Sequence, residues 1–202
     1  MKLFYILLIL IFFPFSSYSQ ISLNKLSTGL SNLWGISVLN DKEILLTQRK
    51  GNVFKLNIFN KNITKIKGVP KVVNFGQGGL LDIAVEDINK NKKVYLCLSD
   101  KVNTTKSATA VHSYDLKNNI LLNKKLLFKS NKPSNSSRHF GCRLAIKGEF
   151  IFATIGDRGS RHDAQNFANH SGSVIKIKKN GSNYNNNAFE NALPEIYSIG
   201  HR

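Results

Sequence analysis

The sequence predicts an all-β protein folded as a β-propeller, and three observations support this prediction. Short runs rich in Val, Ile, Leu, Phe and Tyr alternate with clusters of Asn, Asp, Gly and Lys, a pattern typical of short strands joined by turns. No segment keeps the apolar period of an amphipathic helix. Three sets of these strands resemble one another, and internal repeats of roughly 40–50 residues with four short strands each are typical of propeller blades.

The expected strands follow one another in three sets. In chain order they are 34–40, 41–50 and 51–58; then 80–100 (two strands) and 108–119; then 142–157 (two strands) and 172–183. Each set starts with an apolar strand and turns through charged or Asn residues into a second strand that ends on a polar residue. A further strand then ends near Lys-Leu-Asn or Lys-Lys-Asn, so the sets read as repeats of one unit.

The three sets align on Ile36, Ile83 and Leu144, which are 47 and 61 residues apart. The longer spacing is absorbed by polar loops within 98–110 and 128–140. A two-sheet β-sandwich also shows many short strands separated by turns, and it is the alternative architecture. The internal repeat favours the propeller.

Three sets of strands make at most three blades, whereas a closed propeller typically has four to eight. The sequence ends at 194–202, inside a strand-like run that has no terminal cap. We therefore expect residues 20–202 to be the N-terminal portion of a larger propeller domain, truncated after about three blades. Such a portion would expose a sheet edge and an apolar blade face.

The first twenty residues are expected to direct export. Lys2 precedes an apolar run from Leu3 to Phe15 and then Ser-Ser-Tyr-Ser, which is the layout of a secretory signal peptide. We expect residues 1–19 to be this signal, with cleavage after Ser19, and the mature chain to be periplasmic or secreted. An uncleaved anchor is the alternative, but the run is shorter than the ~20 apolar residues that span a bilayer. No later run approaches that length, so no membrane span is expected after cleavage.

The strongly basic composition does not by itself identify a partner. The chain carries a formal net charge of +17, and removal of Lys2 with the signal lowers it to +16. A basic balance often indicates binding to nucleic acid or to an anionic surface. Here the lysines are scattered through Asn-rich turns, and an exported protein rarely meets nucleic acid, so we expect no nucleic-acid partner.

The two cysteines, Cys97 and Cys142, both lie in apolar, strand-like runs. Two buried thiols acting as small hydrophobic residues are the simpler interpretation. An exported location also permits a disulfide, but the sequence does not show whether the geometry allows one. Pairing of the two cysteines stays open at this point.

His139 and Asp157 stand at the outer ends of two strands that a turn at Gly148 would bring together. The two residues are equally distant from Gly148. Pairing about Gly148 would set Cys142 opposite Thr154 and bring His139 close to Asp157. A histidine beside a carboxylate at the end of an innermost propeller strand could act as a general base, with the carboxylate holding its tautomer. A loop hydrogen bond and a turn aspartate are the alternatives.

Two further residues, Gln77 and Arg202, are candidates for ligand binding. Gln77 lies among the glycines at 76, 78 and 79, where a backbone can approach a ligand closely, and it precedes an inner strand just as His139 does. Arg202 could donate hydrogen bonds from its planar guanidinium group to carbonyl or carboxylate oxygens. A glycine-rich turn between blades and a surface arginine are the alternatives.

The polar segment 157–172 is expected to form a loop at the mouth of the propeller channel. Its His162, Asp163 and His170 show no recognised metal-ligand spacing, so the sequence assigns no metal there.

Taken in order, several stretches resemble one family. They are LWGISVLNDKEILLTQRKGNVFKLN, GQGGLLDIAVED, RHFGCRLAI, IGDRG, DAQNFANHSGSVIKIKKNGSN and LPEIYSIGHR. They are similar to the soluble aldose sugar dehydrogenases, which depend on pyrroloquinoline quinone (PQQ) and form the glucose/sorbosone dehydrogenase family. Each stretch is weak alone, but the ordered set is specific and covers 34–202.

The resemblance implies a six-bladed propeller that holds PQQ and oxidises a small-molecule aldose at its anomeric carbon, with a soluble electron acceptor. It implies that His139 takes the hydroxyl proton while a hydride passes to the quinone, and that Asp157 pairs with this histidine. Gln77 would line the sugar and cofactor pocket. Arg202 would contact the quinone oxygens and stabilise the charge that develops on them.

In the family, further blades follow the Gly-His-Arg stretch and supply an asparagine, the calcium ligands and basic residues that hold the PQQ carboxylates. We therefore expect this chain to carry the proton-abstracting half of the site and to be incomplete or inactive alone, unless a second chain completes the propeller. Two other functions stay open. One is a propeller lactonase with a metal in its channel, and the other is a non-catalytic propeller that binds a carbohydrate or an acidic polymer.

Overall fold

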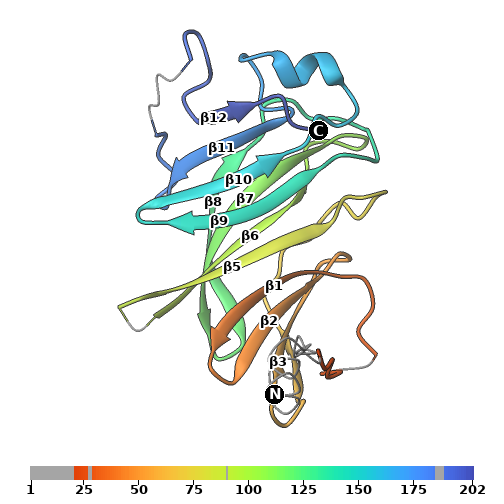
Figure 1. The fold of residues 1–202 in the computed structure, drawn as a ribbon, viewed down its shortest axis with the longest axis vertical. Coiled ribbons are helices and arrows are strands. Elements are labelled where there is room, and N and C mark those ends of the chain that lie inside the picture. Colours follow the sequence, from red (N-terminus) through yellow and green to blue (C-terminus); the bar gives the residue numbers. More distant parts are fainter. Residues whose placement is uncertain (1–20, 27–28, 90, 185–188) are drawn as a thin grey trace, which may run out of the picture.

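The computed structural model describes residues 21–26, 29–89, 91–184 and 189–202. The expected signal peptide at 1–19 lies outside these residues. Three four-stranded antiparallel sheets follow one another along the chain, each in simple sequential order. Figure 1 shows them as successive blades from red to blue. Within the described residues, no helix is long and apolar enough to cross a membrane.

The strands of each blade are adjacent in sequence as well as in space. Blade 1 comprises β1 (Leu33–Asn40), β2 (Glu43–Gln48), β3 (Asn52–Asn57) and β4 (Ile63–Ile66); blade 2 comprises β5 (Leu80–Ile88), β6 (Asn91–Lys101), β7 (Ser107–Lys117) and β8 (Ile120–Lys129); blade 3 comprises β9 (Gly141–Lys147), β10 (Phe150–Ile155), β11 (Ser173–Lys178) and β12 (Ile196–Ile199). A short 3-10 helix, η1 (Arg161–Gln165), lies between β10 and β11.

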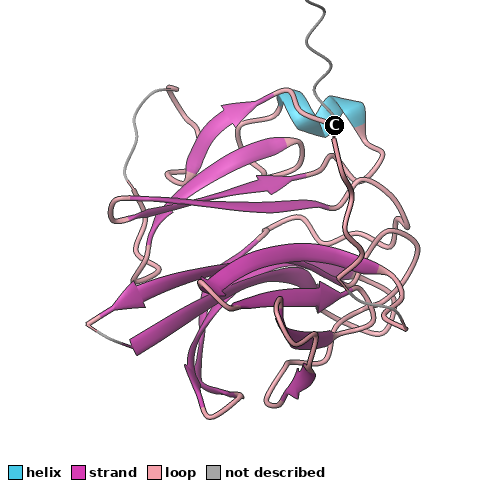
Figure 2. Cartoon of the chain, turned by 60° about the horizontal axis from the view of Figure 1, so that its bottom comes forward, coloured by secondary structure: helices cyan, strands magenta, loops and turns pink. Residues whose placement is uncertain are grey.

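The first strands of the three blades lie side by side, β1 against β5 and β5 against β9. Figures 1 and 2 show this fan of twisted sheets. Gly35 in β1 permits the approach to blade 2, because a Cβ atom there would lie 2.7 Å from an Asp82 carboxylate oxygen. The packing of successive first strands confirms three blades of a β-propeller, and the two-sheet sandwich is wrong.

Two apolar cores hold the blades together. One core lies mainly between blades 2 and 3 and includes Leu81, Tyr95, Val111, Phe140, Ile151 and Ile175. The other lies mainly between blades 1 and 2 and includes Leu45, Val53, Ile66, Leu80, Leu96 and Leu98. Because side chains on a strand alternate between the two faces of its sheet, blade 2 contributes to both cores.

A disulfide bond joins Cys97 to Cys142, with their Cα atoms 5.5 Å apart. Cys97 lies in β6 of blade 2 and Cys142 lies in β9 of blade 3, and both are buried. The simpler expectation of two free, buried thiols is therefore wrong. The bond links blade 2 to blade 3, and Cys142 lies three residues after His139 in the sequence.

The β9–β10 hairpin differs from the expected symmetry about Gly148. Its turn holds two residues, 148 and 149, since Phe150 pairs with Lys147. A bulge then sets both Cys142 and Arg143 opposite Thr154, and beyond it Ile155 pairs with Gly141. The extra residue on β9 offsets the shift at the turn, so the strand ends return to the pairing that was expected.

One face of β1 is exposed and apolar. Gly35 and Leu39 face inward, whereas Ile36 and Val38 on the opposite face are 62% and 68% exposed. At the equivalent position of blade 2, Ile83 is only 3% exposed because blade 1 covers it. The face of blade 1 that points away from blade 2 thus has the chemistry of a surface that packs on another layer.

We expect the double substitution Ile36→Thr and Val38→Thr to delay aggregation on heating, because exposed strand faces and edges promote association between chains. The free energy of unfolding should change by less than about 0.5 kcal/mol. Light scattering during heating and urea denaturation measure the two quantities. The matched control, Ile83→Thr, should lower stability by about 1–3 kcal/mol, since it buries a hydroxyl. An unchanged onset of aggregation in the double variant would show that this face is not the associating surface.

Candidate active site

The hairpin of blade 3 brings His139 and Asp157 into contact. His139 Nδ1 lies 2.7 Å from Asp157 Oδ1. The Asp157 side chain is only 3% exposed, whereas the His139 side chain is 18% exposed. The backbone N–H of Gly159 also donates to Asp157 Oδ1, over 2.7 Å. The carboxylate is thus held from two sides, and the imidazole lies between it and solvent.

The environment of Asp157 keeps its carboxyl group ionised. Burial alone would raise the pKa of Asp157, but the hydrogen bonds from Gly159 and His139 outweigh it, and the pKa lies below its ordinary value. The nearby charges of His139 and Arg202 act in the same direction. An ionised carboxylate accepts a hydrogen bond from Nδ1–H, and in that tautomer the ring carries its lone pair on Nε2. Arg202 Nε donates to that His139 Nε2 over 3.3 Å.

The backbone of His139 is held in a left-handed conformation, with a φ angle of 52°. Its N–H donates to Gln77 Oε1 over 2.7 Å, and its C=O accepts from the N–H of Arg158 over 3.2 Å. Gly156 permits this path, since a Cβ atom there would lie 1.9 Å from the His139 carbonyl oxygen. Non-glycine residues with a left-handed backbone conformation are uncommon and cluster at functional sites.

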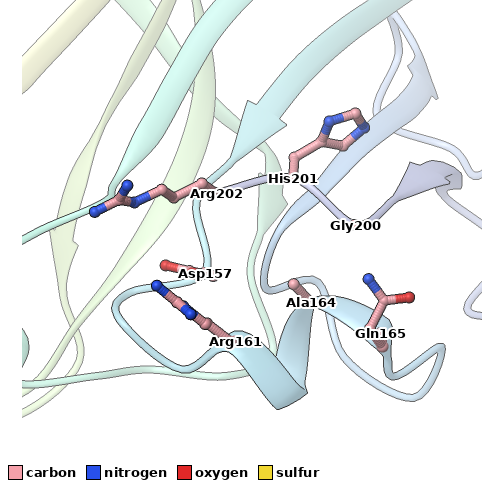
Figure 3. A pocket seen from close by; sticks show the side chains of 7 residues that line it. All are labelled: Asp157, Arg161, Ala164, Gln165, Gly200, His201 and Arg202. Atoms are coloured by element: carbon pink, nitrogen blue, oxygen red, sulfur yellow. The ribbon is translucent and has the colours of Figure 1, made fainter.

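A cavity of about 340 Å³ opens beside Asp157. Its lining comprises Asp157, Arg161, Ala164, Gln165, Gly200, His201 and Arg202. Figure 3 shows that the Arg161 and Arg202 side chains extend on the same side as the Asp157 carboxylate, whereas His201 points away from it. Two guanidinium groups and one carboxylate are therefore part of the lining of one cavity.

The four residues that the sequence singled out as site residues, Gln77, His139, Asp157 and Arg202, meet around His139. His139 contacts Asp157, Gln77 and Arg202 through separate atoms. Gln77 differs from the expectation in one respect, because its side-chain oxygen accepts from the His139 backbone. The polar segment 157–172 borders the cavity through η1.

The sequence did not single out Arg161, and the only available signal was its place in that polar segment. Among the residues that the structure describes, no group of three or more His, Cys, Asp or Glu side chains could hold a metal ion.

Asp157 should make stability depend on pH in the acid range. Because folding lowers the pKa of Asp157 below its ordinary value of 3.8, its contribution to the free energy of unfolding is complete above about pH 5. The contribution is lost as the pH falls through the folded-state pKa. We expect Asp157→Asn to flatten this part of the profile in urea denaturation between about pH 6 and pH 3. Asp41→Asn, at an exposed turn, is the control. Equal declines for the wild-type chain and Asp157→Asn would contradict this assignment.

Comparison with known proteins agrees with the fold. The sequence profile described as "Glucose / Sorbosone dehydrogenase" matches residues 30–202. An uncharacterized protein of Synechocystis sp., slr1608, is 31% identical over 86% of this chain and 48% of its own length. The aldose sugar dehydrogenase YliI of Escherichia coli is 26% identical over 91% of this chain and 52% of its own length. The chain thus spans about half the length of these relatives.

A solved structure supports the same relationship. The crystal structure of a glucose dehydrogenase superposes with a TM-score of 0.81 at 28% identity, over 89% of this chain and 54% of the other. The family profile covers all three blades and the residues that meet at His139. The chain therefore belongs to the glucose/sorbosone dehydrogenase family.

Proposed function

We propose that this chain supplies the proton-abstracting half of a PQQ-dependent dehydrogenase that oxidises an aldose at its anomeric carbon to a lactone. One observation carries the proposal. His139 is fixed through Nδ1 by a buried, ionised Asp157, and its Nε2 accepts a hydrogen bond from Arg202, which lines the cavity beside Asp157. A histidine held in this way is suited to accept a proton at Nε2.

In the proposed reaction, His139 Nε2 takes the proton of the anomeric hydroxyl as the C1–H bond breaks. PQQ, when bound, would supply the quinone that accepts the hydride from C1, and the sugar would become a lactone; the hydride and the proton taken by His139 together account for reduction of the quinone to the quinol. Asp157 holds the imidazole tautomer before the transfer and stabilises the imidazolium after it. Gln77 fixes the His139 backbone, and through it the direction of Nε2.

The residues beside His139 fit such a cofactor. PQQ carries three carboxyl groups and a quinone, and planar guanidinium forks suit carboxylate and carbonyl oxygens. Arg161 and Arg202 line the cavity beside Asp157. These two arginines would hold oxygens of the cofactor, and Arg202 would stabilise negative charge that develops near His139. We infer that the calcium ligands of such a site would come from further blades, outside residues 20–202.

The substrate is a small aldose and the oxidant that regenerates the cofactor is a soluble electron acceptor. Residues 1–19 act as a cleaved signal, so that residues 20–202 work outside the cytoplasm. The exposed face at Ile36 and Val38 is compatible with completion of the ring by further blades, whether on this polypeptide or on a second chain.

A fusion protein tests the proposed function. Residues 30–202 would be joined to the C-terminal half of the E. coli aldose sugar dehydrogenase, which follows the aligned region, and reconstituted with PQQ and Ca²⁺. We expect the fusion to reduce a redox dye only when an aldose is present. A fusion that folds and binds PQQ, but reduces no dye with any aldose, would contradict the proposal.

A further inference from the structure

Directly behind the His139–Asp157 pair lies a second pair, formed by the next residue of each strand end. Phe140 follows His139, and Arg158 follows Asp157. The guanidinium carbon of Arg158 lies 3.6 Å from the centre of the Phe140 ring. Arg158 is only 8% exposed and Phe140 only 3%. The two neighbours of the site residues thus stack on each other in the interior of the protein.

The same guanidinium also holds the loop that leads to His139. Its Nη2 donates to the carbonyl oxygen of Ser136 over 2.6 Å and lies 3.3 Å from that of Ser134. Contacts of 3.4 Å reach the carbonyl and hydroxyl oxygens of Ser107 at the start of β7. Arg158, the residue after Asp157, therefore connects blade 2 with the loop that leads to His139.

A buried cation at this position is costly, because burial disfavours the charged form. Burial lowers the pKa of Arg158 to about 10, and its Nε has no hydrogen-bond partner. The observed partners of the guanidinium are neutral carbonyls, a hydroxyl and a ring. A group that only filled space here could be apolar, since apolar replacements of buried charges are often neutral or stabilising.

Strain at the site adds to this argument. Both His139 and Arg158 have left-handed backbones, with φ angles of 52° and 54°. Such residues persist only where their surroundings over-determine them. The Arg158 N–H donates to the His139 carbonyl. The Arg158 side chain donates to Ser136 in the loop before His139 and stacks on the ring of Phe140, the residue after it.

We propose that Arg158 is a positioning residue, which acts with Phe140 to set the spacing of His139 and Asp157 and thereby the tautomer of the His139 ring. The inference concerns the geometry of the pair, and its test needs neither cofactor nor sugar. It can therefore fail while the proposed function stands.

Nitrogen-15 NMR of the histidine rings in the 202-residue chain tests the proposal, with the His139 signals assigned by their loss in His139→Gln. The wild-type chain is expected to show the Nδ1–H tautomer with a hydrogen-bonded, downfield proton. In Arg158→Met, which removes the guanidinium group, we expect loss of that proton signal and the appearance of the Nε2–H tautomer. A purely structural role would lower the free energy of unfolding and leave the tautomer unchanged.

Two more variants complete the test. Phe140→Leu keeps an apolar side chain and removes the ring, so it should cause the same change to a smaller extent, and it decides the question if Arg158→Met does not fold. Arg138→Met, at an exposed arginine on the other side of His139, should keep the wild-type signal. A folded Arg158→Met or Phe140→Leu chain that retains the wild-type His139 signals would overturn the proposal.

Discussion

Replacing His139 with glutamine is expected to lower the rate of aldose-dependent dye reduction by about 10²- to 10⁴-fold, the usual contribution of a general base. Glutamine keeps a polar side chain of similar reach but has no basic nitrogen at neutral pH. The loss should fall on kcat, because His139 acts on the proton that moves in the reaction. Steady-state kinetics of the fusion protein with PQQ and Ca²⁺ measure this effect.

The matched control is His162→Gln, since His162 is exposed on η1, whereas the histidine that pairs with Asp157 is His139. Its kinetics should equal those of the unmodified fusion. If His139→Gln retained the full rate, the proton would have to leave through another group, and the proposed role of His139 would be wrong.

Loss of the Cys97–Cys142 disulfide is expected to lower the free energy of unfolding by about 4 kcal/mol. The bond closes a segment of 45 residues, and the chain-entropy relation for a loop of that length predicts this magnitude. Total stabilities of domains are only about 5–15 kcal/mol, so the effect is large. Urea denaturation of the double variant Cys97→Ala and Cys142→Ala measures it.

The reduced wild-type chain is the control for this double variant, and the two should unfold at similar urea concentrations. Thiol titration of the unfolded, unreduced chain should find no free thiol. Two reactive thiols, or a double variant as stable as the oxidised chain, would contradict the bond between blades 2 and 3.

The alignment of Ile36, Ile83 and Leu144 located β1, β5 and β9 correctly, because the first strand of each blade carries an apolar run in the sequence. The outer strands were harder to predict. β4 and β8 were not distinguished as separate strands, since β4 has four residues and β8 contains Asn and Lys in its exposed middle. Such edge strands are formed by pairing with a neighbour, which the local sequence does not report.

The contact between His139 and Asp157 was predicted correctly, but for an incomplete reason. The turn has two residues, and the expected register is restored only by the bulge at Cys142 and Arg143. Bulges depend on tertiary surroundings, and this one lies next to the disulfide. The disulfide itself and the buried Arg158–Phe140 stack depend on how blade 2 meets blade 3, which no local pattern encodes.

The most direct test of the account is a double-mutant cycle on the fusion protein with His139→Gln, Asp157→Asn and both substitutions, followed by the rate of aldose-dependent dye reduction. If Asp157 acts through the His139 ring, the double variant should be no slower than His139→Gln alone, because residues that act as a unit show strongly non-additive losses. Losses that multiply would show that the two residues act independently, and would contradict the central claim that His139 and Asp157 form a single base.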